Sequence, residues 1–375
     1  MQFPNYSNSA FNTINSLLKY FGVKNDNLTL KQLDDILNQK KWKNIVFIIM
    51  DGMGQNIINK YIKDNYLDRK NIGPISSVFP STTTAAMNTY YSGKSPIEHA
   101  WLGWSIYFKE CSRTINLFPK TDRYSSQPIE FDYISLIKYE DIFTQIKNVN
   151  NIEQIVIYPK VIENDYPVKN IKVKNVKSMI KEIKKSLKNN KEKFIFAYSP
   201  EPDHLEHNLG PYDVQIEKFM VKFNKLMEKN FSKIKDDTLI IISADHGQIE
   251  INETIYLEDY PALLNTLTLL PMIEPRAASF FVKKEKYLEF ESIFHDIFKD
   301  KYVLFTKEEA IKHHFFGYGK THPKADDVIG DYIAVATSNS LFDIKRSENN
   351  FNFKGHHAGI SSDEMNIPLI VIKKD

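Results

Sequence analysis

Short apolar runs that end in turns alternate along the chain with stretches whose apolar residues recur at helical spacing. The runs are strand-length and unbroken, which indicates strands buried on both faces of a parallel sheet. They cover residues 44–50, 154–158, 194–198 and 238–243. Helical spacing marks residues 7–21, 176–187 and 212–231. The alternation predicts an α/β fold with a doubly wound, mostly parallel sheet flanked by helices.

The pattern also suggests how the chain is divided. Residues 280–282, 302–305 and 331–336 resemble strands, and residues 294–297 and 307–313 resemble helices. They predict a lid subdomain over residues 256–344, inserted into a core domain of residues 1–255 and 345–375. An aromatic-rich stretch has no clear period, so residues 100–130 are predicted to form an aromatic cap loop.

Composition narrows the class of protein. With 375 residues, 42% of them hydrophobic, the chain has ample material for a core. A net charge of +2 gives no reason to expect a nucleic-acid or membrane surface. Cys111 is the single cysteine, and no secretory signal or membrane span is apparent, which predicts a cytoplasmic protein. Oligomeric state is left open.

Acidic and histidine residues follow several of the predicted strands. Asp51 follows the first run, and His357 precedes a last apolar stretch at 368–372. The other groups are Asp203 with His207, and Asp245 with His246. Parallel strands place such residues at one sheet edge, and carboxylates with imidazoles are ligands of Zn²⁺ or Mn²⁺. One such group alone is more often structural, but the coincidence predicts a site for two divalent ions, with Zn²⁺ expected first and Mn²⁺ as the alternative.

A hydroxyl-rich turn supplies candidate nucleophiles. Residues 81–84 read Ser-Thr-Thr-Thr and follow a short predicted strand. A helix N-terminus there favours negative charge, and a hydroxyl beside a metal ion becomes a nucleophile. Two divalent ions would clamp the attacking and leaving oxygens of a phosphoryl transfer. The alternative is that these hydroxyls only cap the helix.

Several motifs taken together resemble the alkaline phosphatase superfamily, and within it the type I phosphodiesterase and nucleotide pyrophosphatase family. They are DGMG, FPSTTT followed by SGKSPIEHA, PDHLEH, ADHG, and GHHAGISSDEM followed by PL, between residues 45 and 370. The resemblance implies one metal on Asp51, Thr83, Asp245 and His246, and another on Asp203, His207 and His357. It also implies that Thr83, ten positions before Gly93, is the catalytic nucleophile. His357 is preferred to His356 as the metal ligand. His356 would instead contact the ligands without binding the metal itself.

One departure from the family pattern concerns the phosphate oxygens. Many members have an Asn about twenty residues past the nucleophile, where this chain has Trp104. Trp104, Tyr107 and Lys109 are therefore the candidate substrate contacts. Trp104 and Trp101 could stack on an aromatic leaving group or simply close the core. His322 is a candidate lid residue.

The sequence therefore predicts a metal-dependent hydrolase of phosphodiester or pyrophosphate bonds that acts on a small-molecule diester or nucleotide. A phosphomonoesterase is the first alternative. It is disfavoured because a dianion needs further cations, and the nucleophile and ligand stretches contain no arginine, which leaves Arg113 and Arg123 of the predicted cap segment as the nearby candidates. A sulfatase is disfavoured because this chain lacks the motif that carries the nucleophile of sulfatases. An inactive module that binds a nucleotide or a partner is the alternative of another class.

Overall fold

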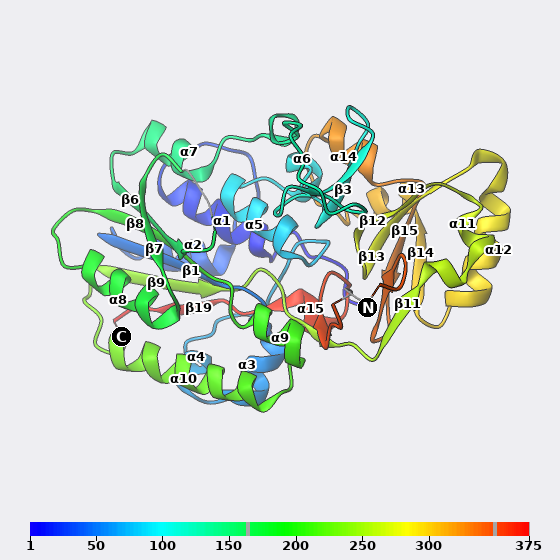
Figure 1. Ribbon diagram of the computed structural model, residues 1–375. Coiled ribbons are helices and arrows are strands. Elements are labelled where there is room, and N and C mark those ends of the chain that lie inside the picture. The colour runs from blue at the N-terminus through cyan, green and yellow to red at the C-terminus, as the bar shows by residue number, and fades with distance from the viewer. Residues whose placement is uncertain (163–165, 348–350, 375) are drawn as a thin grey trace.

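A mostly parallel sheet forms the centre of the computed structural model, which describes residues 1–162, 166–347 and 351–374 (Figure 1). The strand order is β19-β9-β1-β8-β6-β7, and β19 alone runs antiparallel to its neighbour. The strands are β1 (Asn44–Met50), β6 (Glu153–Pro159), β7 (Lys169–Val173), β8 (Lys193–Ser199), β9 (Thr238–Ser243) and β19 (Ile370–Ile372). β1 is buried along its length because it lies between β8 and β9. The predicted doubly wound architecture is confirmed.

Helices cover both faces of this sheet (Figure 1). One face carries α1 (Ala10–Tyr20), α2 (Lys31–Leu37), α5 (Thr83–Ser92) and α7 (Ile142–Val149). The opposite face carries α3 (Gln55–Tyr61), α4 (Tyr66–Arg69), α8 (Val176–Ser186), α9 (Asp203–Leu209) and α10 (Val214–Phe231). The amphipathic stripe of α10 explains its position, since Ile216, Met220 and Phe223 are buried while its lysines face outward.

A second sheet of seven strands packs beside the first (Figure 1). Its order is β14-β15-β13-β12-β3-β4-β5, with antiparallel neighbours throughout. The strands are β3 (Ser105–Phe108), β4 (Arg113–Asn116), β5 (Thr121–Asp122), β12 (Leu267–Glu274), β13 (Ala277–Val282), β14 (Tyr302–Thr306) and β15 (Tyr332–Ala336). Its helices are α6 (Pro96–His99), α11 (Pro261–Leu264), α12 (Tyr287–Phe298), α13 (Lys307–Lys312) and α14 (Pro323–Val328).

The cap loop predicted at residues 100–130 needs correction. This segment contains β3, β4 and β5, and it joins the second sheet where Ser105 pairs with Ile273 of β12. The strands have four residues or fewer, too short to show a period in the sequence, and their partner lies far along the chain. The domain limits at residues 256 and 344 stay a prediction.

Short elements complete the connections near the edge where the ligand candidates lie. They are β2 (Ile75–Ser76) paired with β18 (Asn366–Ile367), β10 (Ile249–Glu250) with β17 (Gly355–His356), β11 (Glu253–Tyr256) with β16 (Ser340–Asp343), and α15 (Ser362–Met365). Three single 3₁₀ turns cover Ile134–Ile137, Leu257–Asp259 and Lys284–Lys286. Across the described residues, no helix has the length and apolar character needed to cross a bilayer.

Candidate active site

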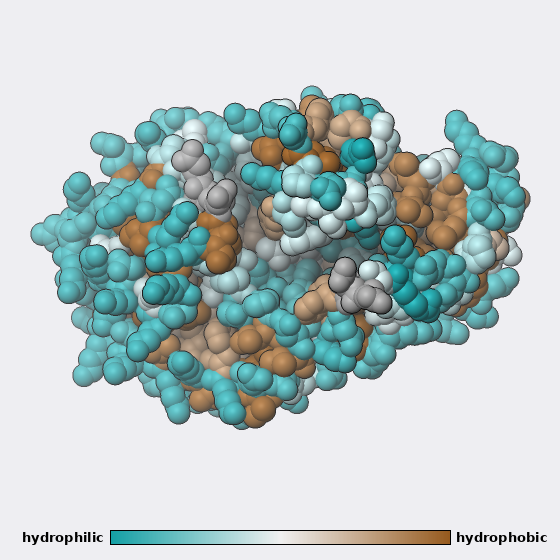
Figure 2. Space-filling view, viewed as in Figure 1, coloured by the Kyte–Doolittle hydropathy of each residue, from teal (hydrophilic) through white to brown (hydrophobic). Residues whose placement is uncertain are grey.

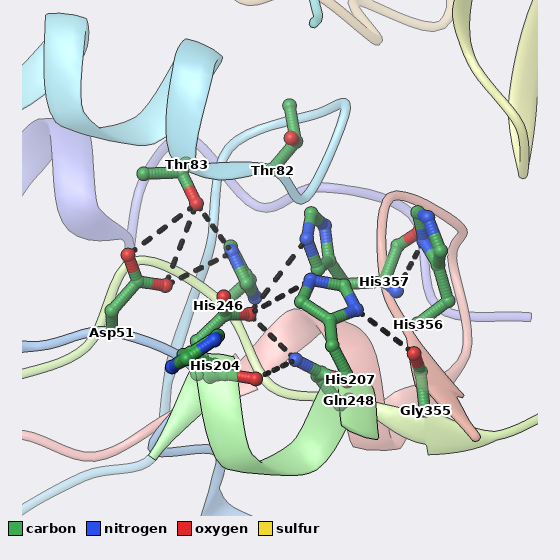
Figure 3. Close-up of polar contacts among 12 residues, drawn as sticks. Asp51, Thr82, Thr83, His204, His207, His246, Gln248, Gly355, His356 and His357 are labelled. Carbon is green, nitrogen blue, oxygen red and sulfur yellow. Dashed lines mark hydrogen bonds and ion pairs between the residues drawn. The ribbon is translucent and has the colours of Figure 1, made fainter. Parts of the chain in front are cut away.

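Three neighbouring strands deliver most of the candidate ligands to one edge of the central sheet. Asp51 follows β1, Asp203 and His207 lie on α9 after β8, and Asp245 with His246 follows β9. Because β8, β1 and β9 are adjacent and parallel, their carboxyl ends meet at this edge. His357 arrives from the segment after β17, and Thr83 begins α5 (Figure 3).

Asp51, Asp245 and His246 form the first cluster, with ligand atoms within 4.8 Å of one another. His246 Nε2 lies 3.4 Å from Asp51 Oδ1 and 3.5 Å from Asp245 Oδ2. All three side chains are buried. Burial, together with the neighbouring carboxylates of Asp245 and Asp203, raises the pKa of Asp51 well above its usual value. Asp245 Oδ2 is buried without a hydrogen-bond partner, so this cluster has the negative charge and the free oxygen that a cation would satisfy.

Asp203, His207 and His357 form the second cluster on the same 4.8 Å criterion. Asp203 Oδ1 lies 3.4 Å from His207 Nε2 and 3.8 Å from His357 Nε2. The rings of His357 and His246 stack with their centroids 3.7 Å apart. The two clusters therefore adjoin, as a pair of metal sites sharing one substrate would require.

Each candidate histidine ligand is oriented by a backbone carbonyl. The Nδ1 atoms lie 2.9 Å from Gly355 O for His207, 3.2 Å from Gly247 O for His246, and 3.1 Å from Ser81 O for His357. A proton on Nδ1 leaves the Nε2 lone pair facing the carboxylates, which is the arrangement typical of metal-binding histidines. Burial and the neighbouring histidines lower the pKa of His357, which favours the neutral ring that binds a metal.

Within the turn at residues 81–84, the side-chain hydroxyl of Thr83 faces the first cluster (Figure 3). Its Oγ1 lies 3.1 Å from His246 Nε2 and 3.4 Å from Asp51 Oδ1. Thr82 is the N-cap residue of α5, but its side chain makes no capping hydrogen bond. Among these hydroxyls, that of Thr83 therefore contacts the first cluster, and the N-cap residue Thr82 does not cap the helix through its side chain.

Glu274 is a part of the site that sequence reasoning missed. This buried residue of β12 accepts a hydrogen bond from Thr82 Oγ1 at 2.8 Å and another from the Trp104 amide at 2.7 Å. It thereby connects the second sheet to the turn that carries Thr83. Burial raises the pKa of the Glu274 carboxyl to about 7. Glu274 lies at the end of the mostly apolar strand β12, and no local motif marks it.

The raised pKa of Glu274 should make the free energy of unfolding depend on pH. Its pKa is higher in the folded chain, so its contribution is fully present below about pH 4.5 and is lost as the pH rises to about 7. From pH 4 to pH 8, we expect the free energy of unfolding of the wild type to fall by about 3 kcal/mol relative to Glu274→Gln. Urea denaturation in chelator measures this difference, and an equal pH dependence in both proteins would refute it.

Gln248 is a second residue that the sequence did not reveal. Its Nε2 donates to Asp203 Oδ1 at 2.5 Å and to the Asp203 carbonyl at 3.1 Å (Figure 3). Gln248 is fully buried after the Asp245-His246 pair, so it connects the two clusters. A carboxylate held in this way keeps its other lone pairs directed at the histidines of its own cluster.

Loss of the Gln248 amide should weaken metal binding by the second cluster. We expect Gln248→Leu to reduce Zn²⁺ affinity there by about 10- to 100-fold, because Asp203 would lose its orienting donor. Competition with a chromogenic chelator measures the affinity. Gln215→Leu, an exposed change on α10, is the control and should leave it unchanged. Equal affinities in the two variants would show that Gln248 does not orient Asp203.

A cavity of about 600 Å³ opens beside the clusters. Asp51, Thr83 and Asp203 lie in its wall, and its aromatic lining consists of Tyr91, Trp104, Phe118, Tyr158 and Tyr198. Trp104 is 42% exposed and meets Phe118 edge to face, with ring centroids 5.7 Å apart. Trp101 is instead buried, and its Nε1 donates to the Ile137 carbonyl. Of the two tryptophans, only Trp104 faces this cavity.

The other predicted substrate contacts lie elsewhere. Lys109 Nζ pairs with Asp327 at 2.8 Å, and Tyr107 lines a separate cavity with Arg113. Their predicted role therefore has no support in the geometry. Lys120, which the sequence did not single out, lines the cavity at Thr83. Lys120 lies in the turn between the short strands β4 and β5, whose positions the sequence did not predict.

Two histidines whose roles the sequence did not settle, His322 and His356, make hydrogen bonds to the backbone. His322 is the N-cap residue of α14, and its Nδ1 accepts from the Lys324 amide at 3.1 Å. His356 is buried in β17, where its Nδ1 accepts from the His357 amide at 2.9 Å. Among the described residues, neither belongs to a cluster of possible metal ligands.

Residues 45–359 match the family described as type I phosphodiesterase / nucleotide pyrophosphatase. No curated protein matches the sequence. Murine ectonucleotide pyrophosphatase/phosphodiesterase 5 superimposes with a TM-score of 0.63 at 16% identity, covering 88% of each chain. An inactive threonine-to-alanine variant of that protein, in complex with AMP, gives a TM-score of 0.62 at 15% identity, covering 89% of this chain and 88% of that one.

Phosphonoacetate hydrolase from Sinorhizobium meliloti, in complex with phosphonoacetate, gives a TM-score of 0.64 at 15% identity, covering 88% of this chain and 89% of that one. The fold, the paired clusters and the family match together define a hydrolase of the alkaline phosphatase superfamily. Within that superfamily, the chain belongs to the type I phosphodiesterase/nucleotide pyrophosphatase family.

Proposed function

We propose that this protein hydrolyses phosphodiester or pyrophosphate bonds through a Thr83 nucleophile and two divalent metal ions. The observation that carries the proposal is the position of Thr83 Oγ1, 3.1 Å from His246 Nε2 and 3.4 Å from Asp51 Oδ1. A hydroxyl at a helix N-terminus beside a cluster of possible ligands is placed for nucleophilic catalysis.

Metal binding is supported by the donor set. Asp51, Asp245 and His246, with Thr83, would hold one ion, and Asp203, His207 and His357 would hold the other. The orphaned Asp245 Oδ2 and the three orienting carbonyls favour this reading. The donors suit Zn²⁺, with Mn²⁺ as the alternative. The ions would lower the pKa of the nucleophile and neutralise charge on the phosphoryl group.

Thr83 attacks phosphorus in line with the leaving group. A bond forms between Oγ1 and phosphorus, the bond from phosphorus to the leaving oxygen breaks, and the Thr83 proton passes to solvent or to the leaving oxygen. The resulting phosphothreonine is then cleaved by water, which returns the hydroxyl to Thr83. Asp51 and His246 hold the hydroxyl in place, and Tyr198 hydrogen-bonds to the Asp51 carboxylate.

The cavity favours a diester with an aromatic group. Trp104 and Phe118 present ring surfaces to it, and a nucleobase could stack there. AMP in the complex of the murine relative has such a base. Lys120 is the single lysine or arginine among the described residues that line the cavity. A phosphomonoester dianion needs more positive charge than this, so the lining favours a monoanionic diester.

Turnover of two chromogenic substrates tests the proposal. With Zn²⁺ or Mn²⁺, we expect bis-p-nitrophenyl phosphate to be cleaved at least about tenfold faster than p-nitrophenyl phosphate, by kcat/KM. Faster monoester turnover would establish the phosphomonoesterase instead. Failure to turn over either substrate, with metal bound, would establish an inactive binding module.

A further inference from the structure

A second cavity, also of about 600 Å³, lies between α8, α10 and the ends of β6 and β8. Its volume is that of a small-molecule site. Most of its wall is apolar, contributed mainly by Val173, Val176, Met179, Phe219, Phe223 and Leu226. Such side chains would gain free energy by enclosing an apolar chain.

Four lysines surround this apolar wall: Lys160, Lys174, Lys177 and Lys222. All four are exposed, and among the described residues none of them forms an ion pair. Glu201 is the one acid among the described residues that line the cavity, and its Oε1 lies 3.5 Å from His204 Nδ1. The rim of the cavity is therefore positively charged. Figure 2 shows this side of the molecule as largely hydrophilic with apolar patches between.

We propose that this cavity binds a single-chain anionic amphiphile of the fatty-carboxylate type as a free monomer. The apolar wall would enclose the chain, and the lysine rim would hold the carboxylate. Charge complementarity selects an anion, since four unpaired lysines would repel a cationic headgroup. The walls lie between two helices and the sheet, so the cavity encloses one chain rather than presenting a flat face to a bilayer.

The cavity also adjoins the candidate active site. Val161, Tyr198 and Pro200 line both this cavity and the one at Thr83. Leu205 of α9 lines it as well, between the candidate ligands Asp203 and His207. The apolar chain of a bound ligand would therefore contact α9 and the residues that precede it, at Pro200 and Leu205. Binding of the amphiphile requires no catalytic step.

Calorimetric titration tests this assignment with dodecanoate below its micelle concentration, on the purified protein with and without added Zn²⁺. We expect one site per chain, with affinity rising about three- to fourfold for each methylene from octanoate to dodecanoate. Dodecyltrimethylammonium should bind at least about tenfold more weakly. An affinity independent of chain length, or equal for both headgroups, would overturn the proposal.

Matched lysine variants locate the ligand. Lys177→Glu combined with Lys222→Glu should weaken dodecanoate binding at least about tenfold, because both line the cavity. Lys181→Glu with Lys229→Glu lies on the same helices, makes the same charge change and should alter binding less than about twofold. Equal losses in the two pairs would mean a diffuse charge effect and would refute a defined site.

Two further controls separate this cavity from other binding. Lys120→Glu alters the cavity at Thr83, so a loss of binding in that variant alone would place dodecanoate there and overturn the proposal. Co-sedimentation with phosphatidylglycerol vesicles identifies a membrane contact. Binding to vesicles without binding to monomeric dodecanoate would also overturn it.

Discussion

Thr83→Ala should reduce turnover of bis-p-nitrophenyl phosphate at least about a thousandfold, a loss of ~4 kcal/mol of transition-state stabilisation. Alanine removes the hydroxyl that lies beside Asp51 and His246, and no other hydroxyl of the turn faces that cluster in the same way. Thr83→Ser keeps the hydroxyl and should retain activity within about a hundredfold. Initial rates at saturating metal measure both changes.

Thr82→Val is the matched control for this prediction. Thr82 precedes the proposed nucleophile, but its hydroxyl donates to Glu274 and not to a candidate ligand. We expect its activity to fall less than about tenfold. Activity that survives in Thr83→Ala but disappears in Thr82→Val would contradict the assignment of the nucleophile to Thr83 and point to Thr82. Circular dichroism shows whether each variant folds.

Arg276→Met should destabilise the fold by about 3–5 kcal/mol, because it leaves Glu364 buried without its partner. Arg276 is fully buried, and its Nε and Nη2 donate to Glu364 at 2.7 and 3.0 Å. Glu364 also accepts from the amide of Gly359, two residues past His357. The pair thus connects the turn between β12 and β13 of the second sheet to the segment carrying a candidate ligand. Urea denaturation measures the loss.

An exposed ion pair serves as the control for the stability loss expected of Arg276→Met. Arg346 makes two contacts of 2.7 Å with Asp259 at the surface, so Arg346→Met should cost less than about 1 kcal/mol. Arg276→Met with Glu364→Leu should recover part of the stability lost by the single change, since no unpaired charge remains. A cost below about 1 kcal/mol for Arg276→Met alone would show that the buried pair does not stabilise the connection.

The part of the fold that the sequence predicted rests on local patterns. Buried runs such as residues 44–50 signal strands by themselves, and parallel strands then fix which ends share an edge. The structure accordingly brings together Asp51, Asp203, Asp245 and their histidines, although these residues are far apart in the sequence. That they bind metal remains a proposal.

The remainder depends on contacts between distant segments, which no local pattern encodes. Glu274 contacts the turn that carries Thr83 from a strand about 190 residues away, and β3 pairs with the distant β12. Tyr107 and Lys109 lie close to Trp104 in the sequence, but alternation along β3 directs Tyr107 away and an ion pair with Asp327 holds Lys109 elsewhere. The cytoplasmic location inferred from Cys111 stays a prediction.

Metal content of the purified protein tests the central claim most directly. After equilibration with Zn²⁺ and removal of loosely bound ions, elemental analysis should give two ions per wild-type chain. His207→Ala, which removes a ligand of the second cluster, should retain one. A wild-type chain that holds no ions, or a His207→Ala variant that still holds two, would contradict the proposed pair of metal sites.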